Sequence, residues 1–499
     1  SYERCSSMKP EMMLVAILLP VLGGAVVPLI PFKKRIHMEI YIESVVVLTT
    51  LIVAGLLVNR PSEPFPIVRF VNNLSLSLEI DGLSMVFAGL VAALWPLATL
   101  YSFEYMKHEK RERFFFMFYT ITYGITLGIA FAEDMLTMYF FYELLTMVTV
   151  PLVLHTLTRE AILASRKYLY YSLGGAAFAF IGLIFLLTYG TTINFTFGGV
   201  LDPAVISGDK RTLLLLIYVI AFCGFGVKAA VSPFNSWLPQ AGVAPTPVTA
   251  LLHAVAVVKA GAFAIIRLTF YSFGPDFIRG SWAQNVVMGI VIFTIVYGCS
   301  RALKETHLKR RLAYSTISNL SYILFGVCIM TPMGLVGALS HMVFHAVMKI
   351  CSFFCVGAVM YKTGKQYVHE IDGFGRRMPV VFGFFTIASL GLMGVPGLAG
   401  FISKWNLASA AVMSDNVLAY VGIGALLVSA LLTAIYMLSI VIRAFFPYKE
   451  KECSIPEETA DPGWMMLVPL CIFAGAIIYF GLHSAPIVDF FTQIAGGNI

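Results

Sequence analysis

Apolar runs of roughly 20 residues recur along nearly the whole sequence, and no other feature constrains the fold as strongly. A helical run of this length spans the hydrocarbon of a bilayer. Of the 499 residues, 59% are hydrophobic and 12% are charged, whereas a typical soluble domain is about 25% charged. The sequence therefore predicts an all-α polytopic membrane protein without a soluble domain large enough to build its own core.

We predict about fourteen transmembrane helices from these runs. Helix 9 is expected to be short, and helix 12 is expected to break at a stretch rich in glycine and proline. Residues 59–82 alternate between apolar and polar side chains, which predicts a small hairpin outside the bilayer. The helices are expected near residues 12–30, 39–58, 83–102, 114–131, 135–155, 168–189, 212–231, 248–270, 286–300, 312–330, 334–361, 379–402, 416–443 and 464–482.

The distribution of lysine and arginine over the predicted loops predicts the topology. The loops on one side carry 22 of the 34 basic residues, and those on the other side carry 7. Such a bias marks the cytoplasmic side of a membrane protein, so both termini are expected outside the cytoplasm, in a plasma-membrane protein. The formal net charge of +7 then reflects loop basicity, and we expect no nucleic-acid partner.

Five basic residues remain inside the predicted helices, where a charge costs about 2.5–3.5 kcal/mol and usually serves a function. We expect Arg267, near a helix end, to reach the membrane interface. Glu143 is the only acidic residue that we place deep in a helix. The other four basic residues are Lys228, Lys259, Lys349 and Lys404.

The stretch from Phe222 to Arg267 predicts a pair of unusual membrane helices. The first carries Lys228 and is expected to break soon after, at Pro233. The second carries His253 and Lys259, which are six positions apart and therefore do not share a helix face. A broken membrane helix exposes backbone groups that need a protein-lined or water-lined cavity. This stretch therefore indicates ion or proton movement.

Helix 11 adds three titratable residues at i, i+4 and i+8, which lie along one face about 6 Å apart per step. Helix 10 adds a polar stripe that is compatible either with a hydrated half-channel or with hydrogen bonding between helices. If Glu143 approaches Lys228, the pair holds the lysine protonated, and separation lets the lysine release its proton. The residues on helix 11 are His341, His345 and Lys349, and those on helix 10 are Ser315, Ser318, Asn319 and Tyr322.

No motif for a bound cofactor is present. The sequence contains no P-loop, no dinucleotide-binding glycine motif in a strand–helix context and no iron–sulfur cysteine spacing. The eight cysteines include no CxxC pair and are expected to be small buried hydrophobic residues. We therefore expect neither a cofactor nor a metal, and neither a redox nor a hydrolytic centre, in this chain.

Six segments together resemble a known family, the antiporter-like subunits shared by Mrp-type cation/proton antiporters, respiratory complex I and membrane-bound hydrogenases or sulfane reductases. The resemblance covers about residues 80–445. The segments are YFFYELL (139–145), FGVKAAVSPFNSWLP (225–239), APTPVTALLHAVAVVKAG (244–261), LKRRLAYSTISNLSYI (308–323), SHMVFHAVMKICSFF (340–354) and GVPGLAGFISKW (394–405).

This resemblance implies fourteen helices with two inverted five-helix repeats, helices 4–8 and 9–13, in which helices 7 and 12 are broken. The corresponding parts of the chain are residues 1–113, 114–270 (first repeat), 286–443 (second repeat) and 444–499. It also implies that Glu143 and Lys228 form the coupling pair and that Lys404 occupies the terminal position on helix 12. The implied connecting and relay positions are His253, Lys259, His341, His345 and Lys349.

The function expected from the sequence is proton translocation, with or without sodium exchange, by one subunit of a multisubunit membrane complex. Half-channels joined by a mid-membrane Glu/Lys/His axis would carry the protons. The expected partners are other antiporter-like and small membrane subunits, lipid and, in a redox-driven complex, a peripheral iron–sulfur arm. Two alternatives are a redox-catalytic or quinone-binding subunit, against which the absent cofactor motifs argue, and a structural scaffold.

Overall fold

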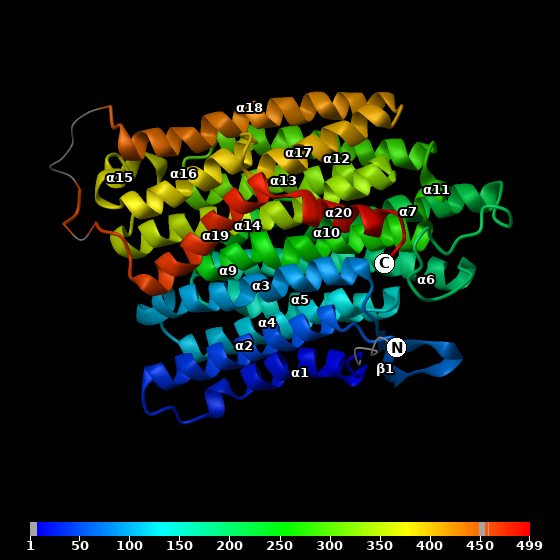
Figure 1. Cartoon of the computed structure of the whole chain (residues 1–499), viewed down its shortest axis with the longest axis horizontal. Helices are drawn as coiled ribbons and strands as arrows, with labels where there is room; N and C mark the ends of the chain where they lie inside the picture. The colour runs from blue at the N-terminus through cyan, green and yellow to red at the C-terminus, as the bar shows by residue number, and fades with distance from the viewer. Residues whose placement is uncertain (1–6, 449–454, 458) are drawn as a thin grey trace, which may run out of the picture.

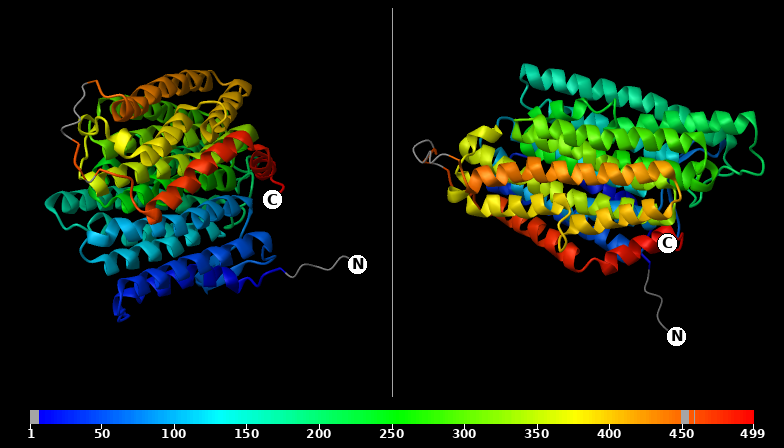
Figure 2. Two further views of the ribbon diagram at one scale, coloured as in Figure 1. Left: turned by 60° about the vertical axis from the view of Figure 1, so that its left-hand side comes forward. Right: turned by 90° about the horizontal axis from the view of Figure 1, so that it is seen from above.

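The computed structural model describes residues 7–448, 455–457 and 459–499 as a bundle of long helices (Figure 1). The order of the helices broadly follows the chain, from α1 at one edge to α18 at the other, and Figure 2 shows the same layering from two further directions. Five residues used in the sequence arguments above lie outside the described residues: Cys5, Cys453, Arg4, Lys449 and Lys451.

Within the described residues, thirteen helices are long and apolar enough to cross a membrane. They are α1 (Glu11–Ala25, continued by η1, Val27–Leu29), α2 (Arg35–Val58), α3 (Gly82–Tyr105), α4 (Glu112–Phe131), α5 (Met135–Val153), α6 (Arg159–Tyr189), α7 (Asp209–Lys228), the continuous run from α9 to η6 (Thr246–Phe273), α12 (Trp282–Lys304), α13 (Leu308–Ile329), α14 (Pro332–Thr363), α18 (Val417–Phe445) and α19 (Trp464–Leu482).

The pair α16 (Pro379–Met393) and α17 (Ala399–Met413) completes the predicted set as one discontinuous helix. The all-α polytopic fold and the break in helix 12 are thus confirmed. Gly394 (φ 89°) and Gly397 (φ 95°) lie in the gap and take a backbone conformation that favours glycine. The division into two inverted repeats stays a prediction.

Two predictions about individual helices are wrong, and one helix was not predicted. The ninth predicted membrane helix, expected to be short, corresponds to α12, which runs for 23 residues from Trp282 to Lys304. Helix 7 ends at Lys228, five residues before Pro233, so the proline is not the point at which it breaks. The C-terminal tail after α19 contains a further helix, α20 (Ala485–Ala495).

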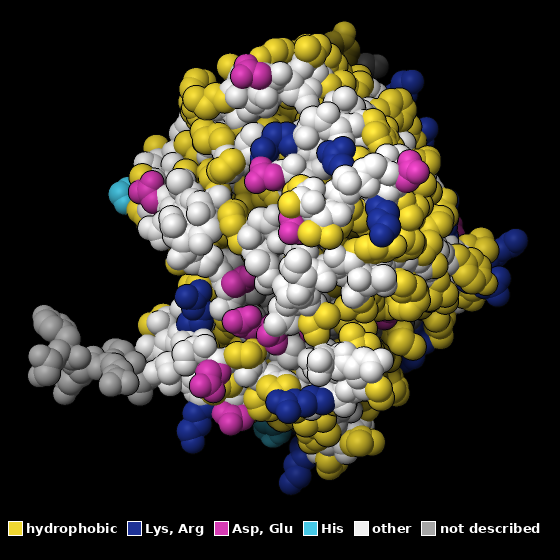
Figure 3. Space-filling view, turned by 90° about the vertical axis from the view of Figure 1, so that its right-hand side faces the viewer, with side chains coloured by type: hydrophobic (Ala, Val, Ile, Leu, Met, Phe, Trp, Pro, Cys, Tyr) yellow, Lys and Arg dark blue, Asp and Glu magenta, His cyan; other side chains and the backbone are white. Residues whose placement is uncertain are grey.

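The predicted hairpin is confirmed as an antiparallel pair, β1 (Phe65–Arg69) and β2 (Ser75–Leu78). The hairpin lies at the end of the bundle where α1 begins and α20 ends (Figure 1). The space-filling view of this end shows acidic and basic side chains among neutral ones, with hydrophobic side chains around them (Figure 3). This end carries the predicted loops with few lysines and arginines.

Arg267 does not reach the interface as predicted, because it is 1% exposed and pairs with Asp81. Asp81 also caps α3 by accepting from Ser84 N at 2.8 Å, and the Arg267 Nη2 atom donates to Ser84 Oγ at 3.0 Å. Burial alone would raise the pKa of the Asp81 carboxyl, but the Arg267 charge and the hydrogen bonds from Arg267 and Ser84 outweigh it and lower that pKa. The pair links α10 to the start of α3.

Glu143 is also not the only acidic residue inside a helix. Glu39 and Glu43 lie within α2, where Glu39 pairs with Arg35 near the helix start. Glu43 has one carboxylate oxygen that is buried without a hydrogen-bond partner. The sequence analysis missed both because they are close to the predicted start of helix 2.

The long helix α14 lies in the middle of the bundle and packs against α13, α16, α17, α19 and the helix from α9 to α10. Its most apolar stretch is entirely buried. Association of helices in lipid depends on close packing and hydrogen bonds, and Gly261 shows such packing. A Cβ atom on Gly261 would lie 2.6 Å from the Ala229 nitrogen, so glycine is needed where α10 crosses the end of α7.

Candidate functional site

The break after α7 places the Lys228 ammonium inside the protein. Lys228 is the last residue of the helix and is 1% exposed. Its Nζ atom donates to the Tyr142 carbonyl at 2.6 Å and lies 3.7 Å from the centre of the Tyr142 ring. A carbonyl and an aromatic face both favour a cation, so the ammonium is held against α5.

Glu143, the next residue on α5, is half-buried and attracts Lys228 through space. Among the described residues, no ion pair joins Glu143 to Lys228, since their charged atoms are more than 4.0 Å apart. The structure therefore brings the predicted pair to neighbouring positions while the lysine contacts the Tyr142 backbone. An ion pair would require the Glu143 carboxylate or the Lys228 ammonium to move.

His253 lies in a π-helical turn, η5 (Leu251–Val255), between α9 (Thr246–Ala250) and α10 (Val257–Leu268). Such turns are frequent at functional sites because they widen one turn of a helix. The ring is fully buried, 4.8 Å from the Phe353 ring of α14, and neither ring nitrogen has a hydrogen-bond partner. Buried polar atoms are normally paired with protein or water, so two unpartnered nitrogens on one buried ring are unusual.

Lys259 and His345 connect α10 to α14. The Lys259 Nζ atom lies 2.5 Å from His345 Nδ1, and both residues are fully buried. His345 Nε2 has no hydrogen-bond partner. The rings of His345 and His341 are stacked with their centres 5.5 Å apart. The face of α14 that carries the predicted relay residues therefore points toward α10.

Lys349 occupies the next turn of the same face of α14. Its Nζ atom donates to Ser315 Oγ at 2.7 Å, and the Leu312 carbonyl lies 3.5 Å away. It also interacts electrostatically with His253, Lys259 and His345. Four of the predicted residues therefore lie within electrostatic reach of one another between η5, α10 and α14.

His341 joins α14 to α13 and α17. Its Nδ1 atom lies 2.9 Å from Ser403 Oγ, and its Nε2 atom lies 3.1 Å from Asn319 Oδ1. Because Asn319 Oδ1 can only accept, Nε2 carries the proton in the neutral ring, and Nδ1 can accept from the Ser403 hydroxyl when that hydroxyl turns away from the Gly400 carbonyl. Two further polar residues thus fix the ring orientation.

Lys404 lies one residue beyond Ser403 on α17. Its Nζ atom donates to the Leu392 carbonyl of α16 at 2.6 Å and lies 5.5 Å from the centre of the Tyr322 ring. Leu392 is in the last turn of α16, where carbonyls lack helical partners and carry negative partial charge. The break between α16 and α17 therefore supplies the site that holds this ammonium.

The structure brings most of the predicted residues together and leaves one gap. Contacts lead from Lys259 through His345 and His341 to Ser403, beside Lys404. Among the described residues, no hydrogen bond joins Lys228 to His253 or Lys259. Four contacting residues were not predicted: Tyr142 and Ser403 contact Lys228 and His341, and Ser429 and Tyr436 contact the polar stripe of α13.

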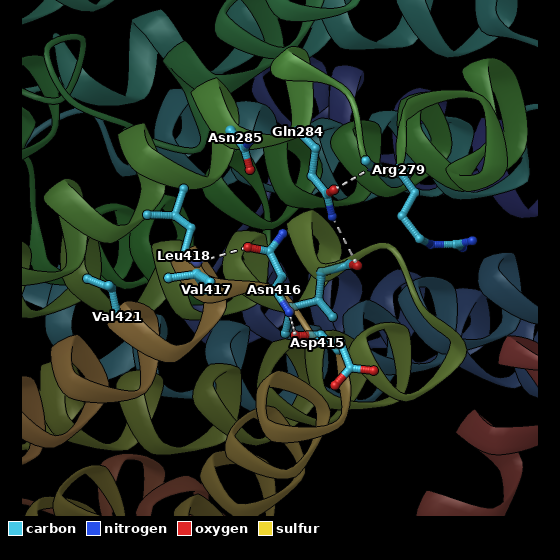
Figure 4. Close-up of a pocket in the computed structure, with 11 residues that line it drawn as sticks. Arg279, Gln284, Asn285, Asp415, Asn416, Val417, Leu418 and Val421 are labelled. Carbon is cyan, nitrogen blue, oxygen red and sulfur yellow. Dashed lines mark hydrogen bonds between the residues drawn. The ribbon is translucent and has the colours of Figure 1, made fainter.

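Two cavities open at opposite ends of the bundle. One, of about 530 Å³, lies at the end that carries the hairpin. The Gln284 and Asn416 side chains line it and accept hydrogen bonds from backbone N–H groups, and Arg279 and Asp415 lie beside them (Figure 4). The other, of about 420 Å³, lies at the end richer in lysine and arginine, where the loop containing Ala244 forms part of the wall.

Lys309, one of the 22 basic residues assigned to loops from the sequence, lines the second cavity. It is 3% exposed and donates to the Ala244 carbonyl at 2.8 Å. It also interacts electrostatically with the buried His253 ring. Within the part of the chain that the structure describes, no group of three or more His, Cys, Asp or Glu residues is arranged to hold a metal ion.

Comparison with known proteins assigns the family. Residues 132–433 match the family described as "NADH:quinone oxidoreductase/Mrp antiporter, TM", and residues 70–116 match "NADH-Ubiquinone oxidoreductase (complex I), chain 5 N-terminus". The first match covers more than half of the chain. The chain belongs to this antiporter family. The resemblance predicted from the six sequence segments is confirmed, and the protein is an antiporter-like membrane subunit.

Similar proteins come from both branches of the antiporter family. The NADH-quinone oxidoreductase subunit N of Desulforudis audaxviator is 28% identical over 84% of this chain and 84% of its own length. The Na(+)/H(+) antiporter subunit A1 of Staphylococcus aureus is 26% identical over 97% of this chain, which spans only 63% of that longer protein.

Two solved structures share the fold of the antiporter family member described here. A chain of the membrane-bound sulfane sulfur reductase, an archaeal respiratory membrane complex, superposes with a TM-score of 0.83 at 23% identity and covers 98% of each chain. A chain of the Mrp complex from Dietzia sp. DQ12-45-1b also gives 0.83, at 18% identity, covering 98% of this chain and 97% of that one. Both come from multisubunit membrane complexes.

Proposed function

We propose that this subunit moves protons sideways through the membrane interior along the line from Lys228 to Lys404. The observation that carries the proposal is the buried contact between Lys259 and His345, which continues through His341 to Ser403. Each of these side chains can both release and accept a proton or a hydrogen bond. A scaffold would not need three ionisable residues in contact at this depth.

The Glu143 and Lys228 side chains supply an electrostatic switch in this proposal. At about 4 Å and an effective dielectric constant near 20, their attraction would be on the order of 4 kcal/mol and would hold the lysine protonated. The observed arrangement, with Lys228 on the Tyr142 carbonyl, represents the separated state. Separation weakens the attraction, but the Tyr142 carbonyl and ring still favour the ammonium, so the lysine releases its proton toward His253 and Lys259 only after it also leaves Tyr142.

The two cavities provide the routes to water. The cavity at the basic end is lined by Lys309, which interacts electrostatically with His253, and water between them would complete the entry route. The cavity beside Arg279 and Asn416 opens at the opposite end, toward which α17 runs from Lys404. Protons would be taken up from the basic end, which the charge distribution assigns to the cytoplasm, and released at the other.

This subunit would act within a larger assembly in the plasma membrane, with both termini outside the cytoplasm. Its proposed partners are other antiporter-like and small membrane subunits. A complex with an iron–sulfur arm would drive proton movement by electron transfer, and an Mrp-type complex would exchange protons for Na+. Mass spectrometry of the subunits that co-purify with the chain distinguishes the two, since iron–sulfur partners occur only in the first.

Replacement of Lys228 tests the proposal. We expect Lys228→Ala to abolish proton movement in inverted membrane vesicles that contain the whole complex, measured with a dye that reports the pH gradient. Lys210→Ala, on the exposed first turn of the same helix, is the matched control and should leave the rate unchanged. Full proton movement in Lys228→Ala, with normal assembly of the complex, would falsify the role of this lysine.

A further inference from the structure

Helix α18 carries a row of hydroxyl groups that faces the second half of the proposed path. Ser429, Thr433 and Tyr436 are spaced at i, i+4 and i+7, so they lie on one face of the helix. All three are buried and point toward α13. No role in the path from His345 through His341 requires them.

One end of this row reaches Lys349. The Tyr436 hydroxyl donates to Ser315 Oγ at 2.8 Å, and the same oxygen accepts from Lys349 Nζ at 2.7 Å. The Thr433 hydroxyl lies 3.1 Å from the Tyr436 hydroxyl. Lys349 is therefore connected to α18 through two hydrogen bonds that do not involve a histidine.

The other end reaches the neighbourhood of Lys404. The Tyr322 hydroxyl donates to Ser429 Oγ, which also lies 3.1 Å from Ser318 Oγ. The ring of Tyr322 is 5.5 Å from Lys404 Nζ and 5.0 Å from the His341 ring. The row thus begins at Lys349 and ends at Tyr322. Among the described residues no hydrogen bond joins the Tyr322 hydroxyl to Lys404, so the last step of a route to Lys404 needs a bridging water.

A single link separates the two halves. The Thr433 hydroxyl donates to the Ser429 carbonyl at 2.7 Å instead of to the Ser429 hydroxyl. Residues four apart on a helix have Cβ atoms about 5–6 Å from each other, a distance that one water molecule can bridge. A hydroxyl that rotates away from a carbonyl can also donate to such a water.

We propose that this row of hydroxyls forms a second polar route between Lys349 and Lys404, parallel to the route through His341. The inference rests on the proposed proton-moving function. The Tyr436 and Tyr322 hydroxyls donate back toward Ser315 and Ser429, so each hydroxyl of the row first rotates to donate to the next group. It then accepts one proton from the preceding group and passes its own on, and so stays a neutral hydroxyl. The proton lost by the Lys349 ammonium is thereby gained at Lys404, with Ser315, Tyr436, Thr433, Ser429 and Tyr322 between them.

Parallel and serial routes predict different effects of combined replacements. If His341 lies on the sole route, His341→Leu abolishes proton movement and Tyr436→Phe adds nothing. If the hydroxyl row is a second route, His341→Leu keeps about a tenth or more of the rate, and adding Tyr436→Phe lowers it at least another tenfold, because paths in parallel are non-additive. The rates are measured for the whole complex in inverted vesicles, with the pH-gradient dye.

Buried hydroxyls also hold membrane helices together, and the controls separate that role from proton transfer. Tyr101→Phe, which removes a buried hydroxyl that donates to the Phe354 carbonyl at 2.8 Å away from the row, should leave the His341→Leu rate unchanged. Thr433→Val, which keeps the side-chain shape, should repeat the Tyr436→Phe effect and serves if the tyrosine variant assembles poorly.

The proposal is overturned if His341→Leu alone abolishes proton movement, if the double variant equals His341→Leu, or if Tyr101→Phe produces the same additional loss. The Lys228→Ala variant distinguishes the two proposals in the same assay. Loss of proton movement in Lys228→Ala without an additional effect of Tyr436→Phe removes only the second route. Full proton movement in Lys228→Ala removes the proposed function itself.

Discussion

The Nζ atom of Lys259 on α10 lies 2.5 Å from Nδ1 of His345 on α14, and this contact joins the two helices inside the protein. A hydrogen bond between these atoms needs one donor and one acceptor. Either the lysine donates to an unprotonated Nδ1, or a protonated Nδ1 donates to a neutral lysine. The two residues therefore share a proton, and its position determines which side of the contact is charged.

Because this contact is a single serial step, we expect Lys259→Met and His345→Leu each to lower proton movement at least about a hundredfold, the lower range for loss of a proton-transfer group. The double variant should be no slower than the slower single variant. Rates are compared in inverted vesicles after normalisation to assembled complex. The exposed Lys107→Ala is the control, and a double variant much slower than either single variant would contradict a serial step.

Glu143 makes no ion pair among the described residues, so its replacement should affect transport more than stability. We expect Glu143→Gln to assemble normally and to melt at the same temperature as the wild-type complex, while proton movement falls at least about tenfold because the charge that attracts Lys228 is missing. Glu143→Asp retains the charge and should recover part of the rate. Equal rates for the Gln variant and wild type would exclude the switch.

The sequence predicted the helices and the residues of the axis because both depend on local patterns. Apolar runs predicted fourteen crossings, and titratable residues within such runs identified Lys228, Lys259 and Lys404. The π-helical turn at His253 was not predicted, since its neighbours form an uninterrupted apolar run without glycine or proline. A wider turn depends on what packs against the helix, and that information is not local.

Partners that are distant in the sequence were also beyond prediction. Arg267 pairs with Asp81 across 186 positions, whereas its place near a helix end had predicted an interfacial position. The polar residues of helix 10 were recognised, but not that Asn319 binds His341 while Ser318 faces α18. The i, i+4, i+7 spacing of Ser429, Thr433 and Tyr436 was a readable signal that the sequence analysis did not use.

The Asp81–Arg267 pair should contribute to stability, because Arg267 is buried and has no other carboxylate partner among the described residues. We expect Asp81→Asn to destabilise the protein by about 3 kcal/mol, as for other buried charges that lose a partner. The measurement is the melting temperature of the purified complex in detergent. Asp276→Asn, which breaks the exposed pair with Arg279, is the control and should change it little.

The same pair predicts a pH dependence. The pKa of Asp81 is lowered in the folded protein from its usual value of 3.8. The pair therefore contributes its full stabilisation above that value and loses it as the pH falls through the lower, folded-state pKa. The stability difference between wild type and Asp81→Asn should be constant from neutral pH down to about pH 5 and should shrink only in stronger acid. A difference that disappears near neutrality would contradict the assignment.

His253 offers the most direct test of hydration along the proposed path. Both of its ring nitrogens are buried without a partner, and so is His345 Nε2. An unpaired buried polar atom costs about 1–3 kcal/mol, which a bound water recovers. An experimental density map of the whole complex should show water within about 3.2 Å of at least one nitrogen of each ring. His155 is the internal reference, since its Nε2 already lies 2.9 Å from the Lys110 carbonyl. Apolar side chains packed directly against all three unpartnered nitrogens would leave protons no way to step between helix 8 and α14.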